Sequence, residues 1–133
     1  MTAPDERLRP PPHLREAGPE LLIDLAATLR ALRDEPHPAK EGHRQISVLH
    51  RGHERLVLFA FEAGGRLPAH AAPGLVTIHV LGGTLRVRTN RGAQDVGAGQ
   101  VLVLDPDLEH EVEALERSDM LLGFHFARPG SAG

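Results

Sequence analysis

The stretch GGRLPAHAAPGLVTIHVLGG, residues 64–83, decides the fold of this chain. His70 follows a pair of glycines, and an apolar segment then runs to a second pair, Gly82 and Gly83. Short apolar segments separated by glycine and proline are typical of β-strands joined by tight turns. The stretch therefore predicts two strands, at residues 66–70 and 75–81, with a histidine in each.

The same pattern continues on both sides of this stretch. Apolar and β-branched segments alternate with turn residues from residue 43 to residue 126, and no helical periodicity interrupts them. Repeated short strands of this kind indicate an all-β barrel or sandwich. The predicted strands are 44–50, 55–62, 66–70, 75–81, 84–89, 100–104, 110–115 and 120–126.

The N-terminal third has a different pattern. Leucines at helical spacing follow Gly18, Pro19 and Glu20, and proline suits the first turn of a helix. The sequence therefore predicts four segments: a flexible tail over 1–17, an amphipathic helix over 18–35, a barrel over 43–127 and a C-terminal tail over 128–133.

Strand periodicity predicts which side chains face the core. Leu85 and Val87 alternate with arginines, so the aliphatic side of that strand should face inward. His110 shares a face with Val112 and Ala114, while glutamates occupy the other face. We therefore expect His110 to lie inside the barrel, where a buried imidazole needs polar partners.

The strand that ends the opening stretch carries the second histidine. Val76, Ile78 and Val80 share one face of this strand, and His79 lies on the opposite face. If the β-branched residues face the core, then His79 points outward. The periodicity thus favours His70 and His110 over His79 as interior histidines.

With these residues in place, the chain resembles the cupin superfamily, and in particular its small single-domain bacterial members. The first cupin motif begins and ends with glycine, here Gly64 and Gly83, and His70 takes its first histidine position. Ala72 stands at the second histidine position, and Val76 at the glutamate position. The resemblance implies a double-stranded β-helix, or jelly-roll barrel, preceded here by the amphipathic helix.

The second cupin motif is also partly present. Gly99 and His110 match its glycine and histidine, and Pro106 lies in the turn between them. Asp107 replaces a glycine of that turn, and Ala114 stands where the motif has asparagine.

The resemblance also implies a metal site of three histidines and one glutamate inside the barrel. Divalent iron, manganese, nickel, zinc or copper suits such donors. Of these four ligands, His70 and His110 are present in this chain, so a bound metal would need a third ligand from elsewhere. The alternative is that the barrel holds no metal. The candidates for this third ligand are His79, His50, His125 and Glu62.

Three functions remain open. The first is binding of a small molecule through His70 and His110, with walls drawn from Val57, Phe59, Phe61, Val76, Ile78 and Val112. The second is a metal-dependent enzyme of the dioxygenase or isomerase type, in which His110 could also serve as a general base. The third is a structural module that associates through the helix or through the segments 57–61 and 101–104.

The composition argues against several classes of cofactor and binding partner. The chain has no cysteine, a net charge of −3, and neither Trp nor Tyr, which argues against thiolate metal sites and against nucleic acid. No apolar run has the length of a membrane span, and the first residues lack the apolar core of a signal peptide. We expect a cytoplasmic homodimer. Three acids before His110 would make the barrel mouth negative and disfavour anionic ligands: Asp105, Asp107 and Glu109.

Overall fold

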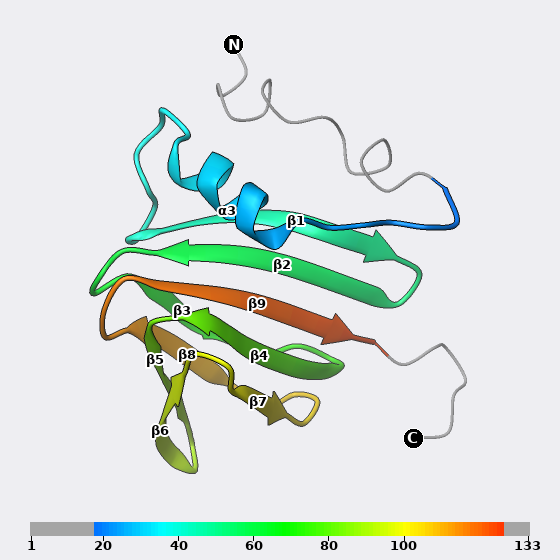
Figure 1. Cartoon of the computed structure of the whole chain (residues 1–133). Coiled ribbons are helices and arrows are strands. Elements are labelled where there is room, and N and C mark those ends of the chain that lie inside the picture. Colours follow the sequence, from blue (N-terminus) through cyan, green and yellow to red (C-terminus); the bar gives the residue numbers. More distant parts are fainter. Residues whose placement is uncertain (1–17, 127–133) are drawn as a thin grey trace.

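The computed structural model describes residues 18–126, which form one helix and nine strands (Figure 1). The elements are α3 Leu25–Arg33, β1 His43–Arg51, β2 Glu54–Phe61, β3 Arg66–His70, β4 Leu75–Gly82, β5 Thr84–Thr89, β6 Gly92–Gly97, β7 Val101–Leu104, β8 His110–Ala114 and β9 Ser118–His125. The predicted tails at 1–17 and 128–133 lie outside the described residues.

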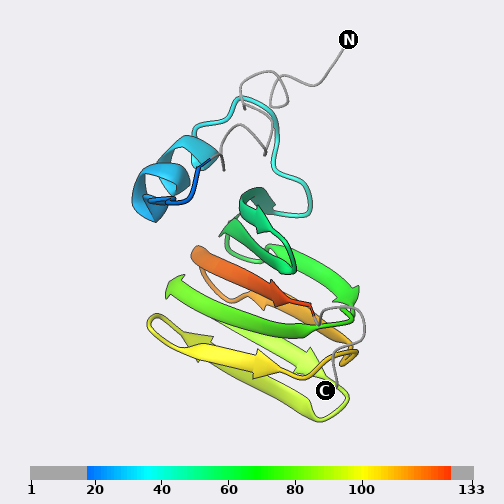
Figure 2. The same ribbon diagram turned by 90° about the vertical axis from the view of Figure 1, so that its right-hand side faces the viewer.

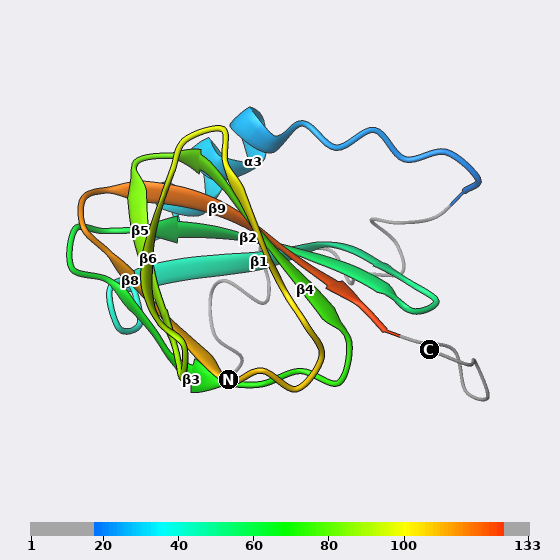
Figure 3. The same ribbon diagram turned by 90° about the horizontal axis from the view of Figure 1, so that it is seen from below.

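The strands form two antiparallel sheets. The larger sheet has the order β1-β2-β9-β4-β7, and the smaller one has the order β3-β8-β5-β6. Figure 2 shows the strands of the larger sheet stacked one above another, with α3 at the β1 end. In Figure 3, the strands β5, β6 and β8 run across the direction of β1, β2 and β9. This is the all-β jelly-roll architecture that the sequence predicts, with a helix ahead of it.

The core lies between the two sheets, and strand periodicity predicts its members correctly. Val76, Ile78 and Val80 are at most 1% exposed, and so are Leu85 and Val87 from the facing sheet. His110, Val112 and Ala114 are buried beside them. The alternation of β-branched and polar residues is therefore what places His110 in the interior.

Strand β2 differs because both of its faces are covered. Val57, Phe59 and Phe61 belong to the core, whereas Leu58 and Ala60 point to the outer face, where α3 packs on β1 and β2. The segment 57–61, considered above as an association surface, is therefore buried within the chain itself.

The helix is shorter than the sequence predicts. It begins at Leu25 rather than at residue 18, because the Asp24 side chain caps it by accepting a hydrogen bond from the Ala27 amide at 3.0 Å. Leu32 is buried against the sheet, whereas Leu22 is 97% exposed. The leucines at helical spacing therefore begin before the helix itself, and Leu22 among them does not pack against the sheet.

Strand β6 is missing from the sequence-based prediction. Only Val96 is buried along it, so it lacks the alternation that reveals a half-buried strand. It pairs with β5, and an exposed ion pair between Arg86 and Asp95 joins opposite residues of the two strands at 2.8 Å.

Candidate functional site

Two histidines from neighbouring strands meet inside the barrel. His70 is the last residue of β3 and His110 is the first residue of β8, and they are direct partners in the antiparallel register. Their ring centroids are 4.2 Å apart, with an angle of 58° between the ring planes. The structure thus brings together the two histidines that the sequence singles out.

The same local hydrogen bond orients each ring. Nδ1 of His70 lies 3.0 Å from the carbonyl oxygen of Pro68, and Nδ1 of His110 lies 3.0 Å from that of Leu108. A carbonyl oxygen only accepts hydrogen bonds, so each Nδ1 carries a proton and donates it. In the neutral rings, both Nε2 atoms are therefore left with a free lone pair.

His110 is the more enclosed member of the pair. It is 1% exposed, and within the described part of the chain its Nε2 has no hydrogen-bond partner. Burial lowers the pKa of His110 below its ordinary value, the Leu108 carbonyl opposes this shift, and a charge on His70 would add to it. His110 is therefore a neutral, buried acceptor without a partner, which is a costly feature to keep for folding alone.

The lowered pKa of His110 predicts a pH-dependent stability. An unfolded histidine binds a proton near its ordinary pKa of about 6.5, whereas folded His110 does so only at lower pH. Between these values the unfolded state binds more protons, so stability falls as pH decreases below about 6.5. We expect the melting temperature of metal-free protein to fall further between about pH 7.5 and about pH 5 in the wild type than in His110→Asn. Parallel curves would contradict this account.

A cavity of about 420 Å³ opens beside the histidine pair. Its walls are mainly apolar, and its polar groups are one imidazole, one amide and one guanidinium. The lining residues are Gln45, Arg55, Val57, Phe59, Leu67, Pro68, Ala69, His70, Leu122 and Phe124. A cavity of this size and character suits a small organic molecule.

The predicted wall residues divide into two groups. Val57 and Phe59 line the cavity beside His70, as expected of wall residues. The other four are packed in the sealed core between the sheets, where they are at most 1% exposed, and they do not line this cavity: Phe61, Val76, Ile78 and Val112.

Two of the candidate third ligands point away from the pair. His79 is on the outer face of β4, as its periodicity predicts, opposite Val101 and Leu121. His125 is also on the outer face, where Nδ1 contacts Glu54 and Nε2 lies 3.4 Å from the Thr77 hydroxyl. The interior position considered for His125 is therefore wrong.

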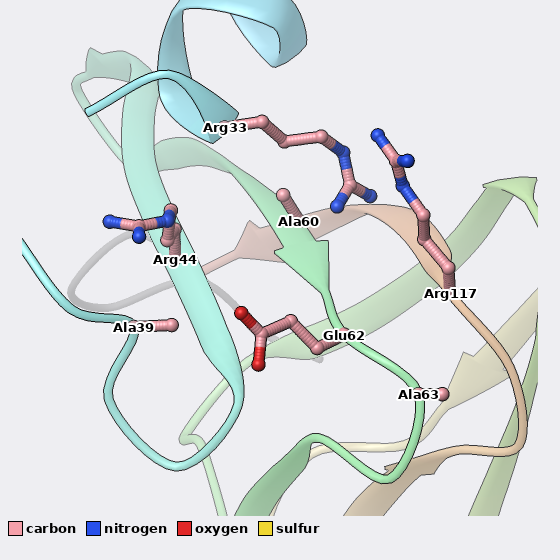
Figure 4. Close-up of a pocket in the computed structure, with 7 residues that line it drawn as sticks. All are labelled: Arg33, Ala39, Arg44, Ala60, Glu62, Ala63 and Arg117. Carbon is pink, nitrogen blue, oxygen red and sulfur yellow. The ribbon is translucent and has the colours of Figure 1, made fainter. Parts of the chain in front are cut away.

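His50 and Glu62 are also far from a metal-ligand geometry. His50 is exposed near the end of β1, where it lies opposite Arg55 on the cavity side of the sheet but does not line the cavity. Glu62 lines a separate cleft of about 360 Å³ outside the barrel (Figure 4).

That outer cleft lies between α3, β1, β2 and the turn before β9. Figure 4 shows the Arg33 and Arg117 side chains on one side of it and the Arg44 side chain on the other, with the Glu62 carboxylate lying between the two sides. Arg33 is held in place because it donates to the Ser118 carbonyl at 3.1 Å and pairs with the Asp119 carboxylate. The cleft shares no lining residue with the barrel cavity.

The described residues do not supply a full metal site. Within residues 18–126, no three side chains from His, Cys, Asp and Glu lie close enough together to hold an ion. His70 and His110 would provide two ligands, whereas stable sites normally use three or more. The donor set therefore does not fit the four-ligand site that the cupin resemblance implies.

Seven residues of the cavity wall were not predicted from the sequence, among them Gln45, Arg55 and Phe124. Pairing of β1, β2 and β9 places Gln45 opposite Phe59, and Phe124 opposite Arg55. The sequence does carry a signal for Arg55, because residues two apart on a strand share a face, and Arg55 therefore lies on the same face as Val57 and Phe59.

A further imidazole lies next to this cavity. His43 is buried, its Nδ1 lies 2.9 Å from the Arg66 carbonyl, and its ring contacts Phe59 and Phe61. Its Nε2 lies 3.3 Å from the Gln45 side-chain amide, and it accepts from the NH₂ group when the amide oxygen and nitrogen exchange places. His43 is a satisfied core residue that positions Gln45 at the cavity.

The fold and this interior site define the class of the protein, which is a small cupin barrel. A conserved protein of unknown function from Streptococcus pyogenes has a similar structure, with a TM-score of 0.67 and 18% identity over 86% of this chain and 93% of its own. A cupin superfamily protein from Desulfitobacterium hafniense matches with a TM-score of 0.66 and 15% identity, over 85% and 96%. KdgF from a Halomonas species matches with a TM-score of 0.61 and 21% identity, over 70% and 88%.

The sequence profile of the AraC-like ligand binding domain matches residues 55–121, just over half of the 133 residues, and the chain belongs to this family. No curated protein matches it in sequence. Among residues 18–126, no helix has the length and apolar character needed to span a membrane.

Proposed function

We propose that this chain is a small-molecule-binding cupin domain, with the ligand held in the barrel cavity beside His70 and His110. The observation that carries the proposal is the buried Nε2 of His110, which lacks a partner, next to a second imidazole that lines the cavity. A ligand hydroxyl or amide would donate to the free lone pair of His70, which lines the cavity and contacts His110. Membership of a ligand-binding domain family supports the same function.

The cavity walls support an organic ligand rather than a bare ion. Val57, Phe59, Leu122 and Phe124 offer aliphatic and aromatic surface, while polar groups are few and separate. Binding sites for small molecules combine such walls with a small number of orienting polar groups.

A fragment screen tests the proposal across several ligand chemistries at once. We expect small acids, amides and alcohols with aromatic or branched bodies to shift the NMR signals of Val57, Phe59 and His70 in the metal-free chain. These fragments should lose about tenfold in affinity when His70 is replaced by alanine, because a hydrogen-bonding anchor is removed. Fragments that bind only elsewhere, or that bind His70→Ala equally well, would contradict the proposal.

A metal-dependent enzyme is the second candidate. One observation favours it: both Nδ1 atoms donate to carbonyl oxygens, which leaves Nε2 free as in histidines that bind metals. Because the described residues offer only this pair, we expect untagged protein from medium supplemented with iron, manganese, nickel, zinc and copper to carry no stoichiometric metal. One ion per chain, lost in both His70→Ala and His110→Ala, would favour the enzyme instead.

A further inference from the structure

The cavity carries a single charged group, the guanidinium of Arg55. Its ten lining residues include no aspartate or glutamate, and the acids that precede His110 in sequence are not among them. In the part of the chain that the structure describes, Arg55 forms no ion pair. A lone cation thus lies at one end of a mainly apolar cavity.

The neighbours of Arg55 explain why no carboxylate reaches it. In the sheet, Arg55 lies opposite His50 on β1 and Phe124 on β9. The adjacent Glu54 points to the other face of β2, where it pairs with His125. Neither strand that flanks Arg55 places an acid on its side of the sheet at this position.

Arg55 and the histidine pair are separated by apolar wall. Arg55, Val57 and Phe59 follow one another on the same face of β2, and residues two apart on a strand are about 7 Å apart. Leu122 lies opposite Val57 in the register and extends the wall onto β9. A ligand that reaches from Arg55 to His70 must therefore have an apolar body between two polar ends.

We propose that the ligand is an organic monocarboxylate, with its carboxylate on Arg55, its apolar body against Val57, Phe59 and Leu122, and a hydrogen-bonding group at His70. This inference rests on the proposed function of the barrel cavity. The guanidinium presents paired N–H donors that match the two oxygens of a carboxylate.

The charge balance favours a carboxylate over a phosphate monoester. A phosphate monoester carries between about −1.5 and −2 charges at neutral pH, and a single guanidinium neutralises only one of them. Arg55 is exposed, so solvent screens the remaining charge, and the preference for a carboxylate rests on matching one negative charge to one guanidinium. A monocarboxylate leaves no such excess.

Two matched probes test this assignment on the full, metal-free chain: 3-phenylpropanoate and its neutral counterpart 3-phenylpropanamide. We expect the carboxylate to bind about tenfold more tightly than the amide, because only the carboxylate forms an ion pair with the guanidinium. Arg55→Gln should remove this preference, because it weakens the binding of the carboxylate and leaves the affinity for the amide unchanged. Arg55→Lys should keep part of the preference.

Arg91→Gln is the control, because it removes the same charge from an exposed turn that does not line the cavity. It should leave both affinities unchanged. Equal binding of the two probes in the wild type, or an equal loss in Arg91→Gln, would overturn the carboxylate assignment but leave the proposed function standing. If neither probe binds in the cavity, both the carboxylate assignment and the proposed function are overturned.

Discussion

Gly83→Ala is expected to lower the free energy of unfolding by more than about 4 kcal/mol, which would leave little or no folded protein at 37 °C. Gly83 has φ +79°, in the left-handed region that favours glycine. An added Cβ would also lie 2.2 Å from the Ser118 hydroxyl oxygen and 2.4 Å from the Arg117 carbonyl oxygen.

These neighbours cannot easily move away. Ser118 is buried, its hydroxyl accepts from the Thr84 amide at 3.0 Å and donates to the Glu116 carbonyl at 2.8 Å. The Arg117 carbonyl is part of the backbone entering β9. Relief of the clash would therefore disturb the junction of β4, β5 and β9, on which both sheets depend.

Gly64→Ala is the matched control, because Gly64 has nearly the same φ of +81° and an added Cβ would meet nothing within 4 Å. It should cost only the backbone strain, about 1–2 kcal/mol. Denaturant unfolding of both variants measures the difference. If the two losses were equal, close packing around Gly83 would not be what requires glycine there.

His110→Leu is expected to separate binding from stability. The free energy of unfolding should stay within about 1 kcal/mol of the wild type or rise, because an apolar side chain removes a buried acceptor that has no partner. Affinity for a ligand in the cavity should fall about tenfold, because His110 packs against His70, the imidazole that lines the cavity.

His79→Leu is the control for this variant, since it makes the same change on the outer face of β4. It should leave affinity unchanged. The measurements are isothermal titration and thermal unfolding on the same samples. A His110→Leu protein that binds normally but unfolds several kcal/mol more easily would show that His110 serves the fold and not the ligand.

The sequence predicts the interior of this barrel better than its cavity. The alternation of residues within a single strand is enough to predict that Ile78, Leu85 and His110 are buried, because it shows which face of that strand is apolar. The pairing of His70 with His110 also follows, since both come from recognisable motifs at strand ends.

The cavity depends on how distant strands align, which periodicity does not give. Arg55 and Phe124 are opposite one another only through the register of β2 and β9. The irregularity between Ser47 and Leu49 changes the face of the residues that follow it, so His50 lies opposite Arg55 on the cavity side of the sheet, whereas Ile46 lies opposite Leu58 on the outer side.

His125 and the helix start show the same limit in other ways. Leu121 lies on the same outer face of β9 as His125. Because Leu121 is aliphatic, the sequence wrongly favours an interior position for both residues. At the helix, proline and leucine favoured a start near residue 18, but capping by Asp24 sets the observed start.

The central claim is that a ligand in the barrel engages the His70–His110 pair, and the imidazole ¹⁵N shifts of these two residues test it most directly. Free, metal-free protein should show both rings protonated on Nδ1, as the Pro68 and Leu108 carbonyls require. Saturation with 3-(4-hydroxyphenyl)propanoate, which carries a hydroxyl donor at the end opposite its carboxylate, should move the Nε2 signals of both rings while Nδ1 stays protonated. Binding that leaves both Nε2 signals unmoved would contradict the account.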